Sequence, residues 1–209
     1  MCIRDSGYTV PTWYGYAGWG CLDYFVEQPG RYSFTEAFLA NQHAMIHRLE
    51  TCFPDVARKP MGIPDEAMKL RRTIKGTARA KALGLGAQDG VGLMFDRDAV
   101  VFYGDPAWEA RMAPSELAYE QSLSEEGGVW TFEVNPSGGA QSFEPVNLNG
   151  SQRGWRPMVA FFPERLEGEI EILEGAELAP VVGDDFILLP NPRKVDAGEV
   201  YRVRFRVGA

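Results

Sequence analysis

The sequence predicts an α/β half-domain with an incomplete parallel sheet, followed by an all-β sandwich. In the first half the order is strand, helix, strand, and the second strand, Ala99–Tyr103, stops at Gly104-Asp105-Pro106. The second half contains only short apolar strands separated by glycine- and proline-rich turns. Charge divides the chain in the same way: residues 1–112 hold 13 basic and 13 acidic residues, whereas residues 113–209 hold 8 and 16.

The first six residues, Met1-Cys-Ile-Arg-Asp-Ser6, resemble the translated read-through of a sequencing adapter, as found in genes from metagenomic assemblies. We therefore expect residues 1–6 to be an artefact that takes no part in the natural fold, and the true N-terminus to lie upstream. The expected domains are then residues 7–112, the α/β part, and residues 113–209, the sandwich. The aperiodic joint at Met112-Ala-Pro114 marks the boundary between them.

The first half begins with a strand at Tyr8–Thr12, which leads into a turn rich in aromatic residues and glycine, residues 13–20. A helix over 34–51 follows, because Ser33 and Glu36 form the S-x-x-E capping box. At 100° per residue its apolar face carries Phe34, Phe38, Met45 and Leu49. The opposite face carries His43 and His47, which this wheel predicts to face water.

A second helix is predicted from Pro64 to Leu83, with Gly84 as its stop. It is strongly basic, which favours a solvated surface face over a patch for an anionic ligand. Its basic residues are Lys69, Arg71, Arg72, Lys75, Arg79 and Lys81.

The second half predicts the strands of an antiparallel sandwich. The clearest strand is the last, because Tyr201, Val203, Phe205 and Val207 alternate with three arginines, as in a half-buried strand. The predicted strands are 129–134, 158–162, 169–173, 186–189 and 199–207, and no helix longer than two turns is expected among them.

Composition excludes several classes of function. A neutral first half and an acidic second half argue against a nucleic-acid or anionic-membrane surface. No apolar run approaches the roughly 18 residues of a transmembrane helix, so no transmembrane segment is expected. Cys21 and Cys52 form neither a disulfide framework nor a CxxC metal site. The polar loops at 147–154 and 184–185 lack calcium-loop spacing and indicate solvated turns. We expect no metal and no cofactor.

Three segments carry a resemblance to a known family: Gly7–Trp13, Phe34–Leu49 and Val100–Pro106. In this order, with a sandwich following, they resemble the C-terminal half of gingipain-like cysteine peptidases. The resemblance implies a caspase-like α/β fold, an immunoglobulin-like sandwich, and a protein or peptide substrate in the intact bacterial protein. It also implies a secreted or cell-envelope location. A caspase-like sheet requires the strands Tyr8–Thr12 and Val100–Tyr103 to be parallel.

The same resemblance implies that the catalytic half is missing. In that family the catalytic histidine and cysteine follow two strands that precede the region matching Gly7, so no catalytic residue is predicted within residues 7–209. A dyad of Cys21 with His43 or His47 is the internal alternative, disfavoured because both histidines lie on the polar helix face. A metal pair of His43 and His47 with Cys52 lacks a third convergent ligand.

What remains of the site is one wall of a substrate pocket. Trp13, Tyr14, Tyr16 and Trp19 follow a strand, where ligands bind in open α/β sheets. The resemblance implies that this loop lines the pocket for the residue before the scissile bond. The alternative, that the aromatic residues pack against the sandwich, stays open. Asp105 is interpreted as a turn residue.

The favoured function is an inactive fragment of a gingipain-like cysteine endopeptidase. The alternative is a non-catalytic surface binding or assembly module with a pseudo-peptidase fold. A weaker third interpretation is a sandwich that binds carbohydrate or protein and carries a helical appendage.

Overall fold

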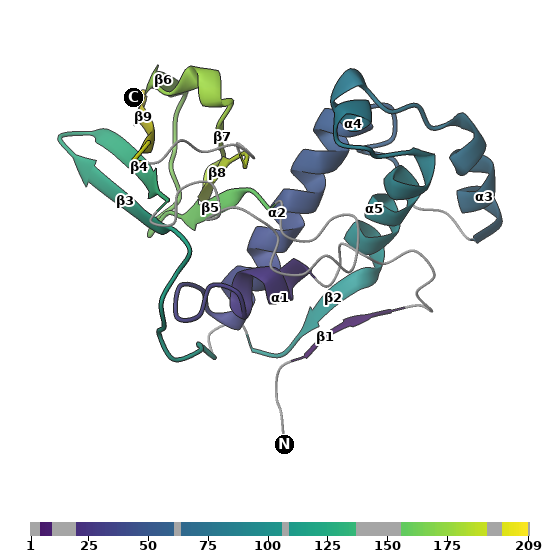
Figure 1. The fold of residues 1–209 in the computed structure, drawn as a ribbon, viewed down its shortest axis with the longest axis horizontal. Helices are drawn as coiled ribbons and strands as arrows, with labels where there is room; N and C mark the ends of the chain where they lie inside the picture. The colour runs from purple at the N-terminus through teal and green to yellow at the C-terminus, as the bar shows by residue number, and fades with distance from the viewer. Residues whose placement is uncertain are drawn as a thin grey trace.

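Helix α2 (Phe34–Cys52) is the central element of a mixed α/β fold, with helices on one side and two antiparallel sheets on the other (Figure 1). The fold is seen in a computed structural model, which describes residues 5–9, 20–60, 64–105, 109–136, 156–191 and 198–208. The predicted capping box is confirmed: Ser33 Oγ accepts from the Glu36 amide, and the Glu36 carboxylate accepts from the Ser33 amide.

α2 is buried along two of its faces. Met45, Leu49 and Cys52 pack against the helical part, in a core that includes Leu93 and Met94. The other buried face is a stripe of alanines, which packs against the strands of the smaller sheet and comprises Ala37, Ala40 and Ala44. Because alanine has only a methyl group, this stripe lets the sheet approach the helix closely.

The helical part contains α1 (Gly20–Phe25), α3 (Pro64–Thr73), α4 (Ala78–Ala82) and α5 (Ala87–Ala99). The predicted helix from Pro64 to Leu83 is wrong as one element, because Ile74 turns into the core and Thr77 starts α4 as its N-cap. Gly84 does stop α4, with a φ of +70° that favours glycine. Helix α5 was not predicted from the sequence; its Gly90 lies against Phe53.

The predicted parallel sheet is also wrong. The first strand is β1 (Asp5–Tyr8), and it pairs antiparallel with β2 (Val100–Tyr103), with Tyr8 opposite Val100. Residues 10–12 of the predicted strand lie outside the described residues. The long connection between β1 and β2 imposes no strand direction, and antiparallel pairing is slightly more stable per residue than parallel pairing.

The second half forms two antiparallel sheets. The larger has the order β3 (Glu120–Glu126), β4 (Val129–Asn135), β9 (Tyr201–Val207), β6 (Ile170–Glu174); the smaller has the order β5 (Met158–Phe161), β8 (Phe186–Leu189), β7 (Val181–Val182). The five predicted strands are confirmed to within two residues, whereas β3 and β7 were missed. The one helical turn in the described part of this half is η2 (Ala176–Leu178).

The two sheets enclose a common core in which Phe132 and Phe205 of the larger sheet meet Met158 and Ile187 of the smaller. The smaller sheet is covered on its other face as well, because Val159 and Leu188 point to α1 and α2. The described part of the second half is therefore packed against the helices and is not an appendage of them (Figure 1).

Candidate functional site

The predicted pocket wall cannot be placed. Trp13, Tyr14, Tyr16 and Trp19 lie outside the described residues, so their role stays a prediction. The described chain resumes at Gly20, where an added Cβ would collide with the side chains of Asn41 and Arg156. Glycine is required at this position because three segments of the chain converge there.

Beside Gly20, a buried ion pair joins the helices to the sandwich. Arg156 Nε donates to Asp23 Oδ2 at 2.9 Å, and both side chains are 7% exposed. Two tyrosine hydroxyls add to this contact: Tyr24 donates to the Pro157 carbonyl at 2.8 Å and Tyr32 to the Val159 carbonyl at 2.6 Å. Burial raises the pKa of both tyrosines, so they act as neutral donors. These contacts fix the position of β5 relative to α1.

Neither described cysteine is accessible to a substrate. Cys21 is 2% exposed and Cys52 is fully buried, and both are reduced. A thiol acts as a nucleophile only where an imidazole and a substrate can both reach it. Burial therefore argues against an internal Cys–His dyad.

The prediction that both histidines face water is wrong. The ring of His43 stacks on Phe186 of β8, with centroids 3.7 Å apart, and burial lowers its pKa although Asp185 and Asp184 partly oppose this. His47 lines a groove between α2 and the sandwich. The alanine stripe explains the error, because Ala40, Ala44 and His47 lie on one face of α2, and that face is covered by the smaller sheet.

This groove has a volume of about 460 Å³. Thr77 builds its helical wall, since its hydroxyl donates to the Thr51 carbonyl at 2.9 Å and caps α4. That bond holds α4 beside the end of α2 and brings Arg79 next to His47. A smaller recess of about 40 Å³ continues past Arg48 and Cys52.

The sandwich supplies the opposite wall. It consists of η2 with Ala179, the end of β8 with Pro190 and Asn191, and Tyr201 of β9. Asn191 is oriented by its amide, which donates to the Arg156 carbonyl at 3.2 Å. Ala179 has a φ of +52°, the one positive φ of a non-glycine residue in the described chain. Such conformations cost free energy and cluster at binding sites.

The helical wall determines the protonation state of His47. The pKa of His47 is lowered to about 4, first by burial and then by the positive charges of Arg79 and Arg48. His47 is therefore neutral at pH 7. The sequence predicted Arg79 on a solvated helix face and Tyr201 in a half-buried strand, and it gave no signal for Glu177 or Asn191. Their convergence on one groove was not predicted, because these four residues come from four separate elements.

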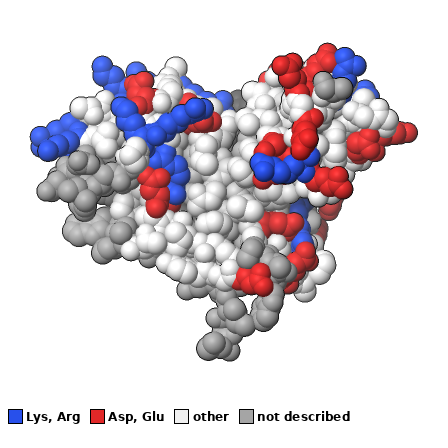
Figure 2. Space-filling view, turned by 180° about the vertical axis from the view of Figure 1, so that it is seen from behind, with Lys and Arg blue, Asp and Glu red and all other residues white. Residues whose placement is uncertain are grey.

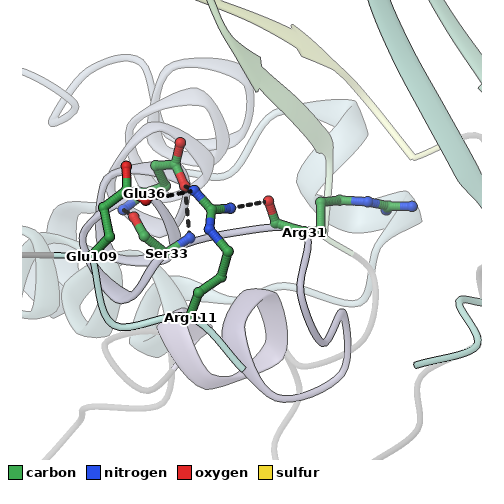
Figure 3. Close-up of polar contacts among 5 residues, drawn as sticks. All are labelled: Arg31, Ser33, Glu36, Glu109 and Arg111. Carbon is green, nitrogen blue, oxygen red and sulfur yellow. Dashed lines mark hydrogen bonds and ion pairs between the residues drawn. The ribbon is translucent and has the colours of Figure 1, made fainter. Parts of the chain in front are cut away.

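A second polar cluster holds the connection between the two halves. Arg111 donates to the Arg31 carbonyl at 2.7 Å and pairs with Glu36 at 3.0 Å (Figure 3). Although serine, glutamate and arginine meet here, Ser33 Oγ is engaged by the Glu36 amide. The cluster therefore anchors the segment around Arg111 to the start of α2, and its chemistry is that of a helix cap.

Charged side chains of both signs lie on the surface of both halves. Lys and Arg gather over the α3–α4 end, whereas on the sandwich they alternate with Asp and Glu (Figure 2). Asp184 of the predicted polar loop pairs with Arg165, as expected of a solvated turn. No cluster of three metal-ligating side chains occurs within the described ranges. None of the helices described here is long and apolar enough to cross a membrane.

Comparison with known proteins adds no relative: no family model, curated protein or solved structure matches this chain.

Proposed function

We propose that this chain is a non-catalytic part of a gingipain-like cysteine peptidase, which holds the catalytic thiol outside residues 7–209. The observation that carries the proposal is the burial of both described thiols: Cys52 is fully buried and Cys21 is 2% exposed. The His43 ring is meanwhile committed to Phe186. A thiolate and imidazole pair must be open to a substrate to cleave it.

The order of the resembling segments supports the family. Two of these segments contact each other, because Phe34 and Phe38 of α2 lie 5.9 and 5.7 Å from Phe102 of β2, measured between ring centroids. The half that follows them is built from two antiparallel sheets, which is the coarse class that the resemblance requires. In this proposal the chain supplies a rigid support for the catalytic half, and Trp13 and Trp19 belong to the substrate pocket.

One observation opposes the caspase-like part of the proposal. β1 and β2 pair antiparallel, whereas a caspase-like sheet has parallel strands. β1 includes Asp5 and Ser6, which belong to the adapter-like hexapeptide. The proposal therefore requires that, with the natural upstream sequence in place of residues 1–6, a parallel strand lies beside β2. An antiparallel β1–β2 pair in that longer protein would end the caspase-like interpretation.

Thiol labelling tests the proposal directly. In the 209-residue chain, iodoacetamide should label Cys21 and Cys52 no faster than an unperturbed thiol, whose pKa is about 8.5. The chain should not cleave peptides. With the upstream sequence restored, a hyper-reactive cysteine should appear outside residues 7–209. In that protein Trp13→Ala or Trp19→Ala should raise KM or shift side-chain preference.

The contrary result is equally definite. Rapid, pH-dependent labelling of Cys21 in the 209-residue chain, lost on His43→Ala or His47→Ala, would make this chain itself the enzyme.

A second candidate function is a non-catalytic binding or assembly module with a pseudo-peptidase fold. The groove lined by His47, Arg79 and Tyr201 favours it, because this hollow is formed without any catalytic residue. The natural upstream sequence separates the two candidates: a strand ending in His-Gly followed by one ending in Cys supports the peptidase. Absence of both residues supports the module.

A further inference from the structure

The groove between α2–α4 and the sandwich has the dimensions and position of a small-ligand site. Its volume of about 460 Å³ lies within the roughly 300–1,000 Å³ typical of ligand pockets. Such sites occur preferentially where two parts of a fold meet, and here the helical part meets the sandwich. The notch between these two parts is visible at the upper edge of the molecule in Figure 2.

The two walls carry opposite charges. Arg79 of α4 stands on the helical wall and Glu177 of η2 on the sandwich wall. Both are exposed, and neither forms an ion pair with another described residue. Because both charges line one groove without pairing with each other, a ligand with a negative and a positive group can satisfy both.

The surface of the groove near these charges is largely apolar. It is formed by Leu83 of the helical wall and by Leu178, Leu189 and Pro190 of the sandwich wall. A ligand that fits has a charged group at each end and an apolar side chain between them.

We propose that this groove binds a short peptide with free termini, whose α-carboxylate pairs with Arg79 and whose α-ammonium group pairs with Glu177. Aliphatic side chains of the peptide contact Leu83 and Leu178. Binding requires no catalysis by this chain, so the inference is independent of the proposed function. It depends only on the residues that line the groove.

His47 reports on this site. The other charged groups that line the groove and its recess are Arg48, Arg79 and Glu177, from α2, α4 and η2. Burial, and after it the two arginines, hold the pKa of His47 low. A carboxylate placed against Arg79 offsets part of this positive potential, and this charge effect acts to raise the pKa of His47.

The test uses the 209-residue chain and the tripeptide Ala-Leu-Ala, followed by NMR of the His47 imidazole and by calorimetry. Two blocked forms of the peptide separate the charges: the C-terminal amide removes the negative group, and the N-acetyl form removes the positive one. Arg79→Gln and Glu177→Gln are the site variants. Lys81→Gln is the matched control, because Lys81 is an exposed cation of the same helix that does not line the groove.

Ala-Leu-Ala should raise the pKa of His47, and each blocked form should bind about two- to fivefold more weakly, as expected for exposed ion pairs. Arg79→Gln should weaken binding of the free peptide and of the acetyl form, and leave binding of the amide form unchanged. Glu177→Gln should weaken binding of the free peptide and of the amide form, and leave binding of the acetyl form unchanged. Lys81→Gln should change nothing. The proposal is overturned if Ala-Leu-Ala leaves the His47 resonances unmoved at millimolar concentration. The proposal is also overturned if Arg79→Gln and Lys81→Gln weaken peptide binding equally.

Discussion

Lowering the pH from 7 to 5 is expected to destabilise this protein through His47. In the folded state the pKa of His47 is about 4, against an ordinary value of 6.5. Protonation therefore favours the unfolded state, so the stabilisation is complete above about pH 6.5 and is lost as the pH falls toward 4. At pH 5 the linkage relation gives a loss of at most about 2 kcal/mol, and partial exposure of the ring reduces it to about 1–2 kcal/mol.

Urea unfolding at pH 7, 6 and 5 measures this loss, with His47→Gln as the comparison. The variant cannot be protonated at this position. Between pH 7 and 5 its free energy of unfolding should therefore fall by about 1–2 kcal/mol less than that of the unmodified chain. Arg79→Gln removes one of the two charges that lower the pKa, and should move the NMR titration of His47 toward 6.5. A His47 pKa of 6 or more in the unmodified chain would refute the reasoning, as would equal pH dependence in His47→Gln.

Two further predictions concern the contacts that join the halves. Arg156→Met should lower the free energy of unfolding by about 3–5 kcal/mol, since it leaves Asp23 buried without its cation. A loss below 1 kcal/mol in urea unfolding would show that Asp23 is solvated. Ser33→Ala should cost about 1 kcal/mol through the lost helix cap. Arg111→Ala should cost less, because its pair with Glu36 is partly exposed; the reverse order in thermal unfolding would contradict this.

The sequence by itself determined the local structure where the signal lies within a few neighbouring residues. Ser33 and Glu36 fixed the start of α2, because a capping box needs only four residues. The alternation of Tyr201, Val203 and Phe205 with arginines fixed β9 and its buried face. Gly84 fixed the end of α4. Each of these depends on backbone geometry that no distant residue has to supply.

Tertiary structure decided everything that depends on what covers a surface. The helical wheel could not show that the polar side of α2 faces a sheet. Ala40 and Ala44 become buried, and His47 half-buried, only when β5 and β8 pack against the helix. The direction of β1 against β2 was likewise open, because nothing in a connection of some 90 residues selects parallel or antiparallel pairing.

The groove depends most of all on the tertiary structure. The residues that line it are scattered over some 150 positions of the sequence, and include His47, Arg79, Glu177 and Tyr201. The sequence around each of them indicates only an ordinary helix, turn or strand. They line one hollow because Thr77 holds α4 against α2 and the Asp23–Arg156 pair holds the sandwich against α1. Spatial convergence of this kind leaves no periodic signal in the chain, whereas secondary structure does.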